Sequence, residues 1–373
     1  MRPRSNSSLV ACRRACMRWC TPALVVLFAA CAKPTLSPPA GNAIPAAANP
    51  GALSAAARGE VLSTEAWSYE DRQGKLITTE SYRIFTTSTR DSMVDRLPVF
   101  LETALGHYSA TLTALPLPPS ELEVYVMANR PQWERLTKRF MGSDANPYLQ
   151  IQRGGFAAEG RAILWDIGRR DTFAILAHEG WHQYTQRTFK DPLPVAIEEG
   201  LATYMEGFKW GGDGGDVPRF LPWANDERFG RLREISGDKA IEPLDRLLRS
   251  TPQELVSEDA DAALNYYAQV WALIHYLNEG EGGKHRPALL AMVQDAVRGG
   301  LLERVRQRLG GRAASAFASR RRGVDVLSIY TGVPSERLDG PYRAFITRVV
   351  RVGAGEFISH GASPAQEPAP RTP

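Results

Sequence analysis

The stretch FAILAHEGWHQY, Phe173 to Tyr184, places two of the chain's six histidines four residues apart, with a glutamate directly after the first. Side chains four residues apart on an α-helix project from the same face, so His178 and His182 can bind a single ion. Glu179 points roughly 100° away from His178 around the helix axis, which places it beside such an ion without making it a ligand. The pattern predicts a metal-binding helix, and the alternative is a pair of histidines packed in the core.

The next segment, LPVAIEEGLATYMEGF, predicts a second helix that starts near Pro194 and packs back against the first. Catalytic zinc commonly takes three protein ligands and keeps a fourth position for water, and two histidines with one glutamate are a known set. Glu198 and Glu199 both qualify as the third ligand, because adjacent residues of a helix point in different directions. A ligating histidine normally donates its other ring N–H to a carboxylate or a carbonyl, and Thr203 and Glu206 are candidate partners.

The residues around the histidines predict how the first helix is buried. Asp171 or Thr172 can cap it. One stripe of the helix is suited to burial, and the histidines lie on another: the buried stripe is Phe173, Ala177, Gly180 and Tyr184. Gly180 and Gly200, one in each helix, would let the two helices approach closely around a metal ion.

The segments HEGWH and AIEEGLATYMEG together resemble the gluzincin clan of zinc metallopeptidases, in its aminopeptidase N-type and peptidase MA-like members. In those families the third zinc ligand is the glutamate before glycine in an EG-x-A signature. The resemblance implies that His178, His182 and Glu199 bind one Zn²⁺ ion and that Glu179 is catalytic. It also implies a zincin-like metallopeptidase fold.

A further match lies in YYAQVWALIHYL, which resembles the helix on which aminopeptidase N-type gluzincins place a tyrosine facing the metal. Tyr267 occupies that position, and Val270 stands where the family pattern has glycine. Tyr266 is an alternative, and a third interpretation is that both tyrosines are packed helix residues. No segment resembles the G-A-M-E-N motif with which those aminopeptidases capture a free amine. The resemblance covers residues 120–280 and implies an endopeptidase more than an aminopeptidase.

The implied chemistry is peptide hydrolysis by a metal-activated water, with Glu179 as general base and Tyr267 stabilising the oxyanion. The strand GRAILWDI is expected to be the sheet edge along which a peptide or protein substrate pairs. Two alternatives are a noncatalytic zincin-like binding lipoprotein, whose ion stabilises the fold, and a zinc amidase acting on peptidoglycan peptides. Glu179 favours an enzyme, because a structural metal site has no use for a carboxylate beside its ligands.

The periodicity predicts an α+β fold, with an N-terminal mixed sheet and helices followed by an all-helical C-terminal half. Strands are expected in EAWSYED, KLITTESYRIFTT, ELEVYVMA and RAILWDI, and helices in VDRLPVFLETALGHYSATLTAL and RPQWERLTKRF. Further helices are expected at residues 171–188, 194–208, 262–279, 285–299 and 336–352. The expected organisation is an α+β part carrying the zinc helices at 59–215, a helical part at 216–353 and a disordered tail at 354–373.

Residues 1–30 predict a targeting segment, with five arginines, no acidic residue and the apolar run TPALVVLFAA. About ten apolar residues are too few for a permanent membrane-spanning helix. The stretch resembles a bacterial lipoprotein signal peptide with LFAAC as its lipobox, which implies a lipidated Cys31 and a membrane anchor at the bacterial cell envelope, at the outer membrane or periplasmic face. An ordinary secretory signal is the alternative. Residues 31–58, rich in proline, alanine and glycine, are expected to be a flexible tether.

The net charge of +4 comes from this targeting segment, because 40 basic and 41 acidic residues follow residue 30. The composition therefore predicts no nucleic-acid partner. Three of the four cysteines, Cys12, Cys16 and Cys20, would leave with the signal peptide, so the mature chain would have no disulfide. The run Arg320–Arg322 could meet anionic lipid near the anchor or could be a solvated charged patch.

Overall fold

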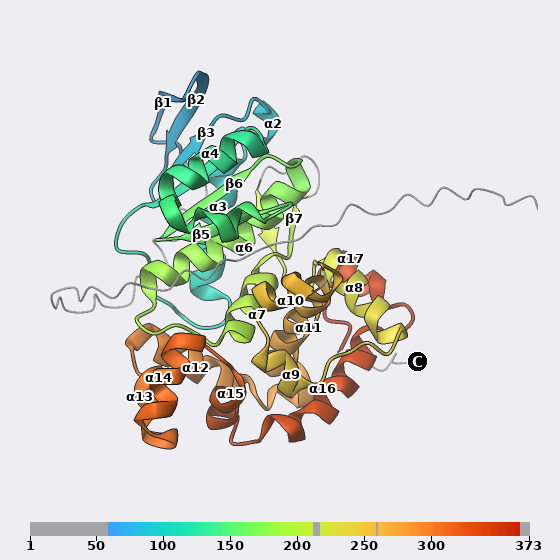
Figure 1. Cartoon of the computed structure of the whole chain (residues 1–373). Helices are drawn as coiled ribbons and strands as arrows, with labels where there is room; N and C mark the ends of the chain where they lie inside the picture. The colour runs from blue at the N-terminus through green and yellow to red at the C-terminus, as the bar shows by residue number, and fades with distance from the viewer. Residues whose placement is uncertain (1–58, 212–216, 259, 366–373) are drawn as a thin grey trace, which may run out of the picture.

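The computed structural model describes residues 59–211, 217–258 and 260–365. Its first half contains a six-stranded sheet in the order β1-β2-β3-β4-β6-β5 (Figure 1). β1, β2 and β3 are antiparallel neighbours, β3, β4 and β6 are parallel, and β5 returns antiparallel to β6. The strands are β1 (Ser63–Tyr69), β2 (Arg72–Thr78), β3 (Tyr82–Thr86), β4 (Leu122–Met127), β5 (Gly155–Ala158) and β6 (Arg161–Trp165).

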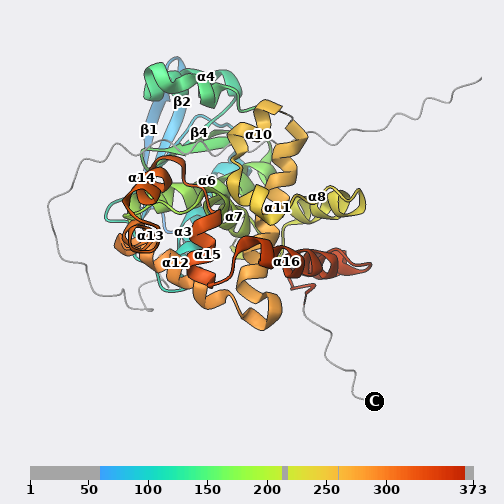
Figure 2. The same ribbon diagram turned by 60° about the horizontal axis from the view of Figure 1, so that its bottom comes forward.

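Both faces of this sheet are covered. Successive strand residues point to opposite faces, so Val124 and Leu164 join the core that includes α3 and α6. Tyr125 and Ile163 instead join a second core under α4, which Figure 2 shows on the outer side of the sheet. The helical segments of this half are α2 (Asp91–Val94), α3 (Leu97–Ala110), α4 (Arg130–Met141), η1 (Gly142–Ala145), α5 (Asn146–Leu149) and α6 (Arg169–Thr188). The mixed sheet with helices is confirmed.

The prediction that GRAILWDI forms the sheet edge is wrong, because β6 lies between β4 and β5. The edge strand is β5, whose sequence GFAA is too short and too rich in small residues to predict a strand by itself. A two-residue turn at Glu159 and Gly160 joins it to β6. Both residues have left-handed backbone, with φ of 53° and 74°, as a tight hairpin requires.

The second half is mostly helical, not all-helical as predicted. A two-stranded sheet interrupts it, formed by β7 and β8, and three residues are too few for the sequence alternation to predict a strand. Its aromatic residues Phe208 and Phe220 pack on Phe100 of α3. The elements after α6 are α7 (Val195–Met205), β7 (Phe208–Trp210), β8 (Pro218–Phe220), α8 (Asp226–Gly237), α9 (Leu244–Arg249), α10 (Pro252–Glu258), α11 (Ala260–Glu279), η2 (Gly280–Gly283), α12 (Arg286–Arg298), α13 (Leu301–Leu309), α14 (Gly311–Arg320), α15 (Val324–Thr331), α16 (Ser335–Val349) and α17 (Ala354–His360).

The expected disordered tail at 354–373 contains helix α17, which corrects that prediction. Ala354 and Ile358 are buried on this helix, and two apolar residues one turn apart are too weak a pattern to predict it. Residues 366–373, like the signal peptide and tether expected at 1–58, lie outside the described residues. Within the part of the chain that the structure describes, no helix is long and apolar enough to cross a membrane.

One hydrophobic core joins the two halves, from Ile77 of the sheet to Ile358 of α17. Helix α11 passes through it beside α7 (Figure 2), and its residues from Tyr266 to Leu277 are buried. The α11 backbone comes close to α7 at Gly200, where a Cβ atom would lie 2.7 Å from the Val270 carbonyl oxygen. Gly180 instead faces the Tyr108 hydroxyl of α3, 2.6 Å from the position of a Cβ atom. The expectation that both glycines bring α6 and α7 together is therefore wrong.

We expect Gly200→Ala to destabilise the fold by about 1–3 kcal/mol, the usual range for an overpacked core. The backbone carbonyl of Val270 cannot rotate away as a flexible side chain can, so α7 and α11 must separate. Gly230→Ala on α8 is the matched control, because no atom lies within 4 Å of its Cβ position. That substitution should leave the stability unchanged or raise it by up to about 1 kcal/mol through helix propensity. Urea denaturation of both variants measures the change in the free energy of unfolding. Equal changes in the two variants would contradict the close contact between Gly200 and the Val270 carbonyl.

Candidate metal centre

Helix α6 carries both histidines in a part of the chain that is buried from Thr172 to Thr185. The helix begins at Arg169 after Gly168, and no side chain caps it. Thr172, one of the two predicted caps, accepts a hydrogen bond from the Ile167 N–H instead. The Nε2 atoms of His178 and His182 lie 3.3 Å apart, as the spacing of four residues predicts.

Helix α7 turns back after Pro194 and brings a carboxylate to the two imidazoles. Glu199 Oε2 lies 3.5 Å from the Nε2 atom of His178 and 3.5 Å from that of His182. One ligand atom from each of the three residues falls within 4.8 Å of the others, and all three residues are buried. The structure thus brings together the three residues that the sequence predicts as ligands, and this group could hold a metal ion.

Glu198, the alternative ligand, contacts the outer side of the site. Its Oε1 atom accepts hydrogen bonds from His182 Nδ1 at 3.2 Å and from the Thr185 hydroxyl at 2.8 Å. His178 Nδ1 donates to Glu206 Oε1 at 2.7 Å, so of the two candidate partners Glu206 is the one that contacts a histidine of the group. Thr203 does not have that role, because its hydroxyl donates to the Gly200 carbonyl. Each imidazole is therefore oriented by a carboxylate.

These hydrogen bonds determine which atoms face the centre. A carboxylate only accepts, so each Nδ1 carries the donated hydrogen, and a neutral imidazole then presents the lone pair of Nε2. Two Nε2 atoms and Glu199 Oε2 bring three such acceptors together at 3.3–3.5 Å. Buried acceptors at this separation repel one another unless a proton or a metal cation lies among them. The donor set therefore fits a metal ion, and nitrogen and carboxylate ligands suit a divalent transition metal.

Glu179 lies beside this group and is completely buried. Among the described residues, neither of its carboxylate oxygens has a hydrogen-bond partner. Burial raises the pKa of Glu179 to about 7, although His178 and His182 act in the opposite direction. A buried carboxylate without a partner is costly, so the arrangement is suited to a charge or a proton donor that binds here.

Arg228 of α8 holds Glu206 in place, and the sequence analysis did not identify it. Its guanidinium forms two hydrogen bonds to the Glu206 carboxylate, at 2.8 and 3.1 Å, and Asn225 Nδ2 adds a third at 2.8 Å. Burial would raise the pKa of Glu206, but Arg228 and His178 lower it to about 2. Arg228 is also buried. A sequence signal exists, because Arg228 lies on the same helix face as the buried Leu232 and Ile235, four and seven residues later.

Tyr267 of α11 lies next to His178, with the ring centroids 5.8 Å apart. The Arg228 guanidinium lies 5.2 Å from the Tyr267 ring on another side. Tyr266 lies one residue before it and contributes to a different pocket. Of the two tyrosines, Tyr267 is thus the one whose ring contacts His178.

The other four histidines lie outside this group. His107 stacks on Phe220, His275 packs on Trp223, and His285 contacts Tyr276 and Glu281. His360 is exposed in α17. In the part of the chain that the structure describes, His178, His182 and Glu199 are the one group of three such ligands found close enough to hold an ion.

Residues 172–299 match the family model described as "Protein of unknown function (DUF1570)". No curated protein matches the chain. The matched range begins in α6 and ends just after α12, so it includes all the residues of the metal centre described above. The chain is therefore similar to this family over α6 and α7, which carry the three candidate ligands, and also over α8 and α11.

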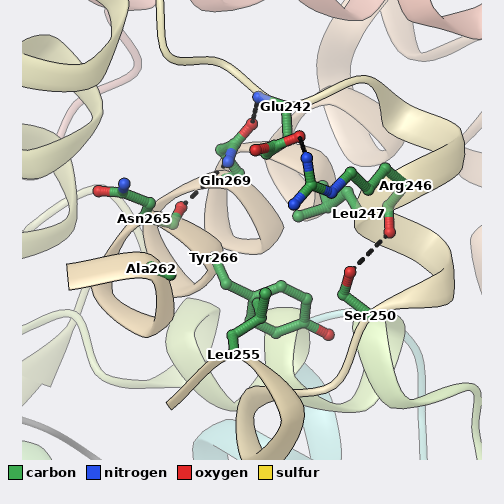
Figure 3. Close-up of a pocket in the computed structure, with 9 residues that line it drawn as sticks. All are labelled: Glu242, Arg246, Leu247, Ser250, Leu255, Ala262, Asn265, Tyr266 and Gln269. Carbon is green, nitrogen blue, oxygen red and sulfur yellow. Dashed lines mark hydrogen bonds and ion pairs between the residues drawn. The ribbon is translucent and has the colours of Figure 1, made fainter. Parts of the chain in front are cut away.

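Figure 3 shows a separate pocket of about 70 Å³ between α9, α10 and α11. Its polar groups bind one another: the Glu242 carboxylate pairs with Arg246, the Glu242 N–H donates to Gln269, and the Ser250 hydroxyl donates to the Arg246 carbonyl. Tyr266 is the nearest of its residues along the chain to the metal centre. Of the residues that the sequence analysis considered for the site, this pocket contains only the alternative tyrosine, Tyr266, and it contains none of the three candidate ligands.

We expect Glu198→Gln to reduce the metal affinity about 10- to 100-fold without abolishing one-to-one binding. The amide can still accept from His182 Nδ1 or Thr185, but it loses the charge that makes the imidazole a stronger ligand. Competition with a chromophoric chelator measures the affinity. Glu121→Gln, an exposed glutamate outside the site, is the control. A complete loss of metal in Glu198→Gln would instead indicate that Glu198 ligates the ion.

Proposed function

We propose that the protein is a zinc-dependent peptidase with a zincin-like fold, more suited to endopeptidase than to aminopeptidase action. The observation that carries this proposal is the combination of a three-ligand group with a buried carboxylate, Glu179, that has no hydrogen-bond partner among the described residues. A structural metal site would not need that carboxylate.

His178, His182 and Glu199 would hold one zinc ion, since two imidazoles and a carboxylate are an established ligand set for catalytic zinc. When bound there, zinc lowers the pKa of a coordinated water toward neutrality and polarises a substrate carbonyl. Glu206 and Glu198 would keep both imidazoles oriented.

Glu179 would act as general base. Its carboxylate would take a proton from the attacking water and pass that proton to the leaving amine nitrogen. Its position favours this role, because Glu179 follows His178 directly on α6 and its carboxylate has no hydrogen-bond partner among the described residues.

Tyr267 would donate its hydroxyl hydrogen to the oxyanion that forms on the scissile carbonyl. Its position beside His178 supports this role. The contact with Arg228 would hold the phenol ring at the same side of the site.

The edge strand β5 supports a peptide as the substrate. It has a sheet neighbour on one side only, and helix α6 is attached to the β5–β6 hairpin through Gln186, which donates to the Ala157 carbonyl and accepts from the Gly160 N–H. All four residues of β5 are buried, so an extended peptide could add to this edge by backbone hydrogen bonds only after the elements that cover it move. Gln186 lies one turn after His182 on α6, so the edge strand and the metal helix are held together.

The burial of the centre supports a second candidate, a noncatalytic binding protein whose metal stabilises the fold. His178, Glu179, Glu199 and Tyr267 are each 0% exposed, so a substrate could reach them only after neighbouring elements move apart.

The test combines metal analysis with hydrolysis. Purified full-length protein should contain one zinc ion per chain and cleave a denatured protein mixture, and chelator should abolish the cleavage until zinc is restored. Cleavage of muropeptides without cleavage of proteins would favour the amidase. Bound zinc with no hydrolysis of either would favour the binding protein.

We also propose that the chain is attached to the bacterial cell envelope through a lipid on Cys31. The sequence of residues 1–31 supports this proposal. Cys31→Ser should abolish incorporation of labelled fatty acid and release the protein from membranes. An unchanged membrane fraction would indicate another means of attachment.

A further inference from the structure

The C-terminal helices concentrate positive charge on a chain that is otherwise acidic. Of the 40 basic residues that follow residue 30, eight are arginines in residues 298–323, and none there is lysine. Of the 41 acidic residues, only Glu303 lies in that range. The rest of the chain after residue 30 therefore has more acidic than basic residues. Residues 298–323 carry a local positive charge, which the nearly equal totals of basic and acidic residues conceal.

Helices α13 and α14 carry most of these arginines and present them outward. Leu301, Val305, Ala314 and Phe317 form the buried side of the two helices, which contact each other. Figure 1 and Figure 2 both place the pair at an outer corner of the helical half. The exposed sides of the two helices therefore adjoin, and both are basic.

Four of these arginines form neither a side-chain ion pair nor a side-chain hydrogen bond with another described residue. Arg298, Arg308, Arg312 and Arg320 are exposed and have no such partner in the part of the chain that the structure describes. The other four bind protein groups, for example Arg304 to Asp295 and Arg321 to the Leu193 carbonyl. Contacts within the protein thus explain four of the arginines. No such contact explains the four exposed ones.

An exposed leucine lies beside two of these arginines in the sequence, next to Arg308 and three residues before Arg312. Leu309 is 45% exposed at the end of α13, between Arg308 and Gly310. Exposed arginines on helices that also expose an apolar side chain are typical of a surface that contacts lipid headgroups and the upper acyl region. Nucleic acid would match the charge, but it offers no apolar phase for the leucine.

We infer that Arg298, Arg308, Arg312 and Arg320, with Leu309, form an arginine surface that binds an anionic phospholipid membrane. Guanidinium groups donate paired hydrogen bonds to phosphate oxygens, which fits phosphate headgroups better than lysine would. The acidic remainder of the chain would be repelled from the same membrane, so the molecule would dock by this corner.

The proposed anchor makes such a contact useful. Twenty-seven residues lie between Cys31 and Gly59, and a fully extended chain of that length spans about 90 Å. A lipid on Cys31 would therefore limit the distance of the domain from the membrane but not its orientation. The arginine surface would supply the orientation, and it does so whether or not the metal centre is catalytic.

The test is sedimentation of the full chain with vesicles of phosphatidylglycerol and phosphatidylcholine, and with vesicles of phosphatidylcholine alone. A basic residue near an anionic surface strengthens binding by about five-fold. Replacing all four arginines by glutamine should therefore weaken binding to the anionic vesicles by about 100-fold or more, and leave binding to the neutral ones unchanged. Replacing them by lysine should retain most of the binding, and added salt should weaken it.

A matched variant removes the same charge elsewhere, through glutamine at the exposed Lys138, Arg139, Arg233 and Arg337. It should bind anionic vesicles as the wild type does. The inference is overturned if this control loses as much binding as the arginine variant, or if the arginine variant, with unchanged thermal unfolding, binds anionic vesicles normally. It is also overturned if the wild type prefers a duplex oligonucleotide to anionic vesicles at the same salt concentration.

Discussion

Glu179→Gln should lower the rate of peptide hydrolysis by about 10²- to 10⁴-fold, the usual contribution of a general base. The amide has the shape of the carboxylate but cannot take a proton from water. The metal content should stay at that of the wild type, because Glu179 is not among the three ligands. The rate of cleavage of a quenched peptide pool, at equal zinc content, measures the effect.

The same variant should be no less stable than the wild type when both are metal-free. The wild-type carboxylate is buried without a hydrogen-bond partner among the described residues, and a neutral amide costs less to bury than a charge. Loss of activity without loss of stability is the mark of a residue kept for function. Glu121→Gln, exposed and far along the chain from the site, controls for general effects. A Glu179→Gln protein that hydrolyses peptides at the wild-type rate would exclude Glu179 as the base.

The ligand residues could be predicted because their signals are local. The spacing of His178 and His182 within one helix determines that their imidazoles share a face, and a short connection makes the next helix pack beside it. The choice between Glu198 and Glu199 depended on resemblance, because spacing alone allowed both. The structure separates them physically: Glu199 faces both Nε2 atoms, and Glu198 faces the other side of His182.

Contacts from distant parts of the chain could not be predicted in this way. Arg228 reaches Glu206 only because α8 packs on α11, which in turn packs on α7. The sequence likewise does not show which neighbour occupies the space beside a glycine. The prediction placed Gly180 and Gly200 at one contact between α6 and α7, whereas Gly180 faces α3 and Gly200 faces α11. Elements shorter than two turns or four residues, such as α9 and β8, show too few repeats of the pattern to be found.

Arg228→Met should destabilise the metal-free protein by about 3–5 kcal/mol, the range for breaking a buried ion pair. The substitution leaves the Glu206 carboxylate buried, with His178 and Asn225 as its remaining partners, at 2.7 and 2.8 Å. It should also lower the metal affinity about 10- to 100-fold, since Glu206 would no longer hold the His178 ring firmly. Denaturation in the presence of chelator and a separate metal titration measure the two effects. Arg233→Met, at an exposed position of the same helix, should change stability by less than about 0.5 kcal/mol.

A second substitution separates stability from positioning. In Arg228→Met/Glu206→Leu the buried charge is gone, so most of the lost stability should return, because an apolar pair can replace a buried ion pair at little cost. The metal affinity should not recover, because His178 Nδ1 then has no carboxylate to receive its hydrogen. If both quantities recover together, Glu206 supports only the fold, and the orientation of His178 must come from the packing of Tyr267 against its ring. If neither recovers, α8 is held to α7 mainly by this ion pair, and the metal centre depends on that helix contact.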